Sequence, residues 1–440
     1  MADKPQFKFM ELFFLARRPK LGGMPEEWIE PSQPEQFDAQ IVRSDFVIES
    51  ELAGFNLAGS AIVKQDLQDL RIYLLKAYFR SNTRAKFQQN RYFLQQWILV
   101  LGTFLTALVA ALTFTVNPGA PAAAVRDAAG AAAEVTAVPG AEDIPPPAQE
   151  EVVPNLPTTT QARISGIITA IATFVTTIVS SRAQGDQAQY NWYLQRTVTE
   201  ELRRHYFLFL AHLPPYHTEN YAEVLESNVV QIERQLDQRG GSTEATEAPP
   251  RNPHTEDELQ ALVDLYRAKR VQVQTVFYDA RIKENAYNAD FVSTVGVILV
   301  AGATLLSTLN IVLGAPVLIL FIALLPVFAA LLVSFEKIYG WGRQITLYKN
   351  ALDRLSVDNT IPPAIGRRPR TTYLQVFIDY VTAVENTLQN EVSQWGQAVL
   401  KDGSNVSSLS AKETLDLALA KSNLPPDQIE IVRQMFEQQP

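Results

Sequence analysis

The chain has 440 residues, a formal net charge of −9 and no cysteine. Without cysteine it has no disulfide framework, thiolate metal site or thiol nucleophile. The mildly acidic balance argues against nucleic acid as a partner, because binding phosphates requires clustered basic residues.

Residues 1–59 form an N-terminal segment, and the first long helix is expected after it. No glycine or proline lies between Gly59 and Gly102, which allows a continuous helix of about 60 Å at 1.5 Å per residue. An apolar stripe at helical spacing predicts that this helix packs in a cytoplasmic bundle; it consists of Leu67, Leu70, Leu74 and Tyr78.

The first unit, residues 60–239, contains two uncharged apolar segments at 97–116 and 164–181. Each is close to the ~20 residues that a helix needs to cross the membrane, so both are predicted to span it. Residues 117–163 between them are rich in Ala, Pro and Glu and predict an exposed loop.

The exit from the second span carries the pattern Y-x-W-x-x-Q-x-T. Amphipathic Tyr and Trp rings favour the headgroup level of a membrane, and the polar side chains can bond to neighbouring helices. The four residues are Tyr190, Trp192, Gln195 and Thr197. The carboxylates Glu200 and Glu201, further along this helix, are interpreted as a solvated face.

Residues 240–254 read as a linker, and the second unit covers 255–358. Thr255 and Glu258 form a predicted capping box at its start. Two further uncharged segments, 291–309 and 316–335, predict spans three and four, joined by a tight turn at Gly314 and Pro316.

The Y-x-W-x-x-Q-x-T pattern recurs directly after the fourth span, which indicates an internal duplication of helix, span, tip, span and helix. The second copy consists of Tyr339, Trp341, Gln344 and Thr346. Lys and Arg gather outside the two hairpin tips, so both termini are predicted to be cytoplasmic, in a multi-pass protein of the inner (cytoplasmic) membrane.

Residues 359–440 predict C-terminal cytoplasmic helices. One of them carries residues near heptad spacing, which fit either a coiled coil between subunits or packing onto the stalk of the same chain. These candidate oligomer or stalk contacts are Phe377, Val381, Val384, Leu388, Glu391 and Trp395.

A hydroxylated stripe on span two is the candidate pore lining. The alternative is close helix packing, since Thr and Ser are favoured at helix interfaces in membranes. The stripe consists of Thr169, Thr173, Thr176 and Ser180.

No catalytic, cofactor or metal site is predicted. His205, His212 and His217 lie close in sequence but lack the spacing of a metal site, so packed histidines are the favoured interpretation. The sequence contains no P-loop, dinucleotide-binding, G-x-S-x-G or H-E-x-x-H pattern.

The exit helix of the first unit resembles the SLATT type of bacterial two-span modules. The resemblance rests on Trp192, Arg196, Thr197, Glu201 and Leu202. The second unit keeps Trp341, Thr346 and Leu352 but has Ile345 in place of the Arg and lacks the Glu. A terminal V-E, acidic residue and W pattern is supplied by Val384, Glu385, Glu391 and Trp395.

The resemblance covers roughly residues 66–213 and 257–396 and implies tandem SLATT-like modules in a membrane effector that oligomerises and perturbs the membrane.

The sequence therefore predicts an all-α integral membrane protein with four transmembrane helices, arranged as two duplicated hairpins with long cytoplasmic helical extensions. Its partners are expected to be the lipid bilayer, further copies of itself and possible cytoplasmic proteins. Two functions stay open. One is a pore-forming or ion-conducting effector. The other is a non-conducting scaffold that binds partners through its cytoplasmic helices. A transporter is a weaker option, because unbroken spans offer little for a midplane substrate site.

Overall fold

The computed structural model describes residues 18–116, 168, 171–172, 175–180, 187–234, 252–358 and 369–407. Every secondary-structure element in this part of the chain is a helix. The first half contains α2 (Pro34–Arg43), η2 (Glu49–Phe55), α3 (Ala61–Asp69), η3 (Leu70–Leu74), α4 (Leu75–Val116), α7 (Ala188–Leu210) and α8 (Tyr221–Arg234). The second half contains α9 (Glu256–Tyr266), η4 (Arg267–Val271), α10 (Gln272–Leu313), α11 (Pro316–Tyr339), α12 (Trp341–Asp358) and α13 (Arg370–Ser407).

The two long helices predicted from the absence of Gly and Pro are confirmed. α3, η3 and α4 follow one another without a break, as do α9, η4 and α10. The second begins at the predicted capping box, in which the Thr255 hydroxyl accepts from the Glu258 amide at 3.3 Å and the Glu258 carboxylate accepts from the Thr255 amide at 2.8 Å.

Each long helix contains one π-helical turn, η3 in the first and η4 in the second. A π-turn inserts one extra residue and is common at functional sites in helices. The two turns occupy similar places in the two halves, since each precedes an apolar segment on the same helix.

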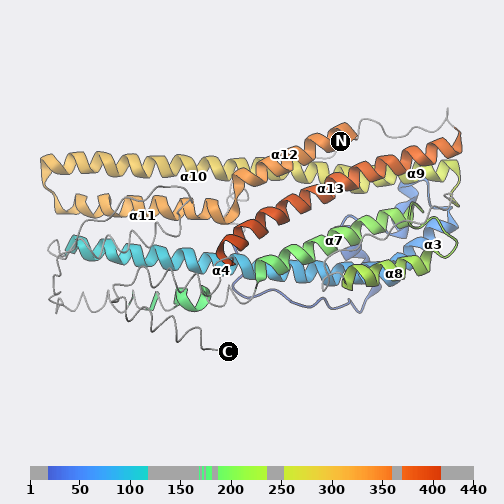
Figure 1. Cartoon of the computed structure of the whole chain (residues 1–440), viewed down its shortest axis with the longest axis horizontal. Helices are drawn as coiled ribbons and strands as arrows, with labels where there is room; N and C mark the ends of the chain where they lie inside the picture. The colour runs from blue at the N-terminus through green and yellow to red at the C-terminus, as the bar shows by residue number, and fades with distance from the viewer. Residues whose placement is uncertain are drawn as a thin grey trace, which may run out of the picture.

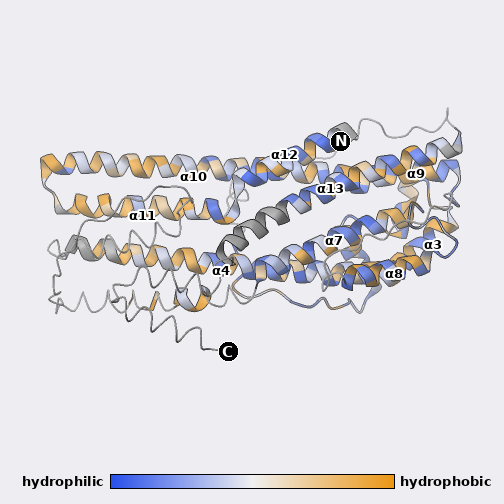
Figure 2. Ribbon diagram, in the orientation of Figure 1, coloured by the Kyte–Doolittle hydropathy of each residue, from blue (hydrophilic) through white to orange (hydrophobic). Residues whose placement is uncertain are grey.

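The molecule is elongated, with its apolar helices at one end (Figures 1 and 2). Among the residues that the structure describes, three helices are long and apolar enough to cross a membrane: Ala61–Val109, Glu256–Leu313 and Val317–Ser356. They overlap the predicted spans one, three and four. Half of span two, 164–181, falls outside the described residues, as does the whole of the loop 117–163.

The turn between α10 and α11 has the predicted form. Gly314 ends α10 with a φ of +59°, a left-handed conformation that glycine adopts without a Cβ penalty, and Pro316 opens α11. α10 packs against α11 and α12, while α4 packs against α11 and α7.

The polar end holds the main hydrophobic core, to which α3, α4, α7, α8, α9 and α13 contribute. Phe377, Val381, Val384 and Leu388 are at most 5 % exposed and lie inside it. α13 therefore packs onto helices of its own chain, which is one of the two arrangements that the sequence left open. The backbone of Trp395 lies in α13.

The end of the predicted linker is part of this packed region. The Asn252 side chain donates to the Ala211 carbonyl at 3.0 Å, and His254 is fully buried. The second unit is thereby joined to the end of α7 just before α9 begins.

Candidate functional site: an aromatic junction and a buried polar network

The two copies of the Y-x-W-x-x-Q-x-T pattern meet at one ring. Phe93 of α4 contacts Trp192 of the first copy, with ring centroids 5.5 Å apart, and stacks on Tyr339 of the second at 5.1 Å. One turn further along α4, the Trp97 indole donates to the Tyr339 hydroxyl at 3.0 Å. Trp341 is 2 % exposed. The tryptophan and tyrosine rings thus join the two units to each other.

The polar residues of the pattern bond mainly within their own helices. Thr197 and Thr346 each donate to the carbonyl four residues earlier. Gln344 donates to the Tyr339 carbonyl at 2.6 Å and accepts from Asn285 of α10 at 3.3 Å. Gln344 is thus the member that reaches a neighbouring helix, as the sequence suggested. Tyr190 lies at the start of α7 and is partly buried.

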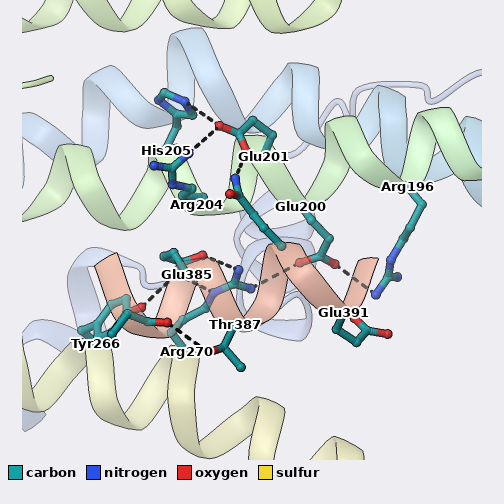
Figure 3. A network of polar contacts seen from close by, with 12 residues as sticks. Arg196, Glu200, Glu201, Arg204, His205, Tyr266, Arg270, Glu385, Thr387 and Glu391 are labelled. Atoms are coloured by element: carbon teal, nitrogen blue, oxygen red, sulfur yellow. Dashed lines mark hydrogen bonds and ion pairs between the residues drawn. The ribbon is translucent and has the colours of Figure 1, made fainter. Parts of the chain in front are cut away.

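A buried ion-pair network joins α7, η4 and α13 (Figure 3). Arg270, in the π-turn η4, donates twice to Glu385 of α13, from Nε at 3.0 Å and from Nη2 at 2.8 Å. Its Nη1 donates to Glu200 of α7 at 3.3 Å. The Arg270 and Glu385 side chains are both 2 % exposed. The Tyr266 hydroxyl also donates to Glu385, at 2.9 Å.

The interpretation of Glu200 and Glu201 as a solvated face is wrong. Their side chains are 13 % and 24 % exposed, and both carboxylates form ion pairs. Glu201 accepts from Arg204 at 3.0 Å and from His205 at 3.2 Å. Glu200 bonds to Arg270 of η4 and Glu201 accepts from Gln389 of α13, contacts that a periodicity argument on α7 alone could not reveal.

The surrounding cations keep both carboxylates ionised. Burial alone favours the neutral form, but Arg196, Arg203 and Arg270 lower the pKa of Glu200 to about 2. Burial is likewise outweighed at Glu201, whose pKa is lowered to about 2 mainly by His205 and Arg204. The network is therefore charged throughout the neutral pH range.

Glu391, one of the predicted α13 contacts, behaves in the opposite way. Burial raises the pKa of its carboxyl to about 7, and the Glu200 charge adds to the shift, while Arg196 opposes it. The Tyr278 hydroxyl of α10 lies 3.5 Å from Glu391. Burial and the Glu391 charge both raise the pKa of the Tyr348 hydroxyl of α12. Glu391 therefore titrates near neutral pH, beside a network that does not.

Glu391 makes the fold pH-sensitive in a defined direction. Because its folded pKa of about 7 lies above the ordinary 4.5, the folded chain holds a proton that the unfolded chain loses between these values. Stability is fully present below the lower pKa and is lost as the pH rises through the higher one. We expect the free energy of unfolding of the wild type to fall by about 2–3 kcal/mol from pH 5 to pH 8, relative to that of Glu391→Gln, which has no such proton. Denaturant unfolding of both proteins across this range measures the difference, and parallel pH profiles would contradict it.

The candidate pore-lining residues are only partly described. Thr169 and Thr173 lie outside the described residues. Thr176 donates to the Ala172 carbonyl at 2.9 Å, and a Cβ built on Gly102 of α4 would lie 2.1 Å from its methyl group. Thr176 therefore packs tightly against Gly102 of α4. Ser180 is partly buried.

The histidines take different partners. His205 pairs with Glu201, whereas the His212 ring bonds to the Asp66 carboxylate at 3.0 Å. His217 is buried. Asp66 lies 146 residues from His212 in the chain, so spacing around the histidines could not indicate it.

One local similarity was missed in the sequence. "RAKFQ" at 84–88 and "RIKEN" at 281–285 share an R-x-K pattern followed by an amide. Each segment follows the π-turn of its own long helix, and the number of residues between turn and segment is the same in both. The pattern is short, and the matching positions of the two π-turns are what make the similarity between the two helices recognisable.

Two family models match the chain. Residues 266–395 match the SMODS and SLOG-associating 2TM effector domain 1, so the resemblance to this effector type is confirmed there. Residues 76–223 match a second family, described as protein of unknown function (DUF4231). The unit that spells the SLATT signature more fully therefore belongs to the other match. No curated protein and no solved structure matches the chain.

Proposed function

We propose, from the premise that residues 266–395 form a two-transmembrane effector domain, that this chain is a homo-oligomeric membrane effector that opens an ion-conducting path. The proposal includes four spans, with 164–181 as span two, and both termini on the cytoplasmic side of the inner membrane. It includes no catalytic step.

The observation that carries the proposal is an exposed stripe on α10, inside the effector domain. Its residues recur at intervals that place them on one helical face, and they are small, hydroxylated or β-branched. The stripe consists of Thr294, Val297, Ala301, Thr304 and Thr308. In the described structure all five are exposed, with Val297 at 66 %.

The stripe lies away from the chain's own contacts. Gly302 and Ala303 lie toward the packed side of α10, with Leu325 of α11 3.5 Å from a Cβ built on Gly302 and Ala303 8 % exposed. In a bilayer, small and hydroxylated residues favour contact with another helix or with a water-filled path. A ring of copies would place these threonines along its axis, whereas Thr176 is already packed against Gly102.

The absence of native cysteine allows a direct test. Single variants Thr304→Cys, Thr308→Cys and Thr176→Cys each carry the only thiol in the chain. After reconstitution in liposomes, we expect wild-type ion flux, and a charged thiol reagent should suppress flux through the two α10 variants. Thr176→Cys should react slowly and keep its flux, because Gly102 shields that position.

Two other outcomes would redirect the interpretation. Rapid block of Thr176→Cys with no effect at Thr304 and Thr308 would move the path to span two. No flux from a well-folded oligomer of the wild type would favour the non-conducting scaffold, whose cytoplasmic helices bind partner proteins. Native mass spectrometry in the same detergent gives the subunit number.

A further inference from the structure

Three side chains with metal-binding atoms meet in the cytoplasmic core, away from the ion-pair network. Asp66 comes from α3, His212 from the end of α7, and His254 from the residues just before α9. All three are buried, with at most 3 % of their surface exposed. Their ligand atoms lie within 4.8 Å of one another.

The three ligand groups are close enough together to share one ion. His212 Nε2 and Asp66 Oδ2 are 3.0 Å apart, and the rings of His212 and His254 are perpendicular, with centroids 4.9 Å apart. Zinc bonds of about 2.0–2.2 Å place neighbouring tetrahedral ligand atoms roughly 3.4 Å apart. Small side-chain movements would therefore bring all three atoms onto one ion.

The backbone fixes each ligand in place. His212 adopts a φ of +47° in the turn that ends α7, where its amide donates to the Phe209 carbonyl at 3.0 Å. The His254 amide donates to the Asn252 side chain at 3.0 Å, and that side chain donates to the Ala211 carbonyl. Asp66 sits two turns into α3, whose N-cap is Ser60.

The local charge also suits a cation. Asp69 adds a second carboxylate near Asp66, so the charge around the cluster is negative. A dication would stabilise both carboxylates. Two imidazoles and one carboxylate are ligands that suit zinc and similar divalent transition metals.

We propose that Asp66, His212 and His254 bind one divalent transition-metal ion of the zinc class, as a structural site. The ion ties the start of the second unit, at His254, to α3 and α7 of the first. Because all three ligands are buried and come from both units, the role of the ion would be to hold the two units together.

The test uses the full chain, purified in detergent, stripped with chelator and reloaded with Zn²⁺. We expect about one zinc per chain by elemental analysis and a higher melting temperature with zinc than with chelator. His254→Gln removes one ligand and should weaken binding by about 100-fold or more. His217→Gln is the matched control, since it replaces a buried histidine outside the cluster and should bind like the wild type.

A second readout does not depend on the variants. Co²⁺ bound by the wild type should show the intense visible absorption of a tetrahedral centre, and Asp66→Asn should lose it. The proposal is overturned if the reloaded wild type holds no zinc, or if His254→Gln and Asp66→Asn bind as much as the wild type. Circular dichroism and size-exclusion chromatography establish that each variant is folded.

Discussion

Replacing Arg270 with methionine is expected to lower the free energy of unfolding by about 3–5 kcal/mol, the cost of breaking a buried pair by removing one partner. Glu385, 2 % exposed, loses both bonds to the guanidinium, and Glu200 loses one of its cations. Two carboxylates then remain buried with too little positive charge. Denaturant unfolding of the detergent-solubilised protein measures the loss.

The control is Arg80→Met. Arg80 pairs with Glu233 at 2.9 Å, but its side chain is 45 % exposed, and surface pairs contribute about 0–1 kcal/mol. Adding Glu385→Met to Arg270→Met should recover much of the stability, because it removes the stranded charge. Equal effects of Arg270→Met and Arg80→Met would show that the network does not stabilise the fold.

The Phe377→Ala variant is expected to cost about 3–5 kcal/mol, the range for removing a buried aromatic side chain. Phe377 is fully buried in the core that α13 shares with the other helices at the polar end of the molecule. Because its contacts are intramolecular, the loss should not depend on protein concentration. Thermal unfolding at several concentrations, with native mass spectrometry, checks both statements.

Gln375 provides the matched control on the same helix. Gln375 is exposed, and its side chain donates to Asp379 at 2.8 Å. Gln375→Ala should therefore change the free energy of unfolding by less than about 0.5 kcal/mol. A Phe377→Ala variant that keeps its stability but dissociates the oligomer would instead place this residue at a subunit interface.

The long helices and their boundaries could be predicted because the signals are local. The stretch without Gly or Pro, the Thr255 capping box and the Gly314 turn each depend on residues that are neighbours in the chain. The apolar segments at 97–116, 291–309 and 316–335 are read from composition in the same way. The helix ends at Val116, Leu313 and Pro316 lie within a few residues of the ends of these segments for that reason.

The polar network could not be predicted, because its members come from three separate elements. Glu200, Arg270 and Glu385 look like ordinary helix-surface charges when each helix is considered alone. Only the close approach of α7, η4 and α13 buries them. The cluster of Asp66, His212 and His254 escaped for the same reason, since two of its three members lie outside the histidine-rich stretch.

The π-turn η4 has a mechanical consequence for the effector domain. The turn sets the rotation about the helix axis between Arg270 and the side chains of α10, because each residue of an α-helix turns the chain by about 100°. Converting η4 to regular α-helix would therefore rotate the Thr294–Thr308 face about the helix axis by roughly a quarter turn. Arg270 lies within this turn and is anchored to Glu385 and Glu200. These ion pairs therefore hold the rotational position of α10, a helix long and apolar enough to cross a membrane, relative to α7 and α13.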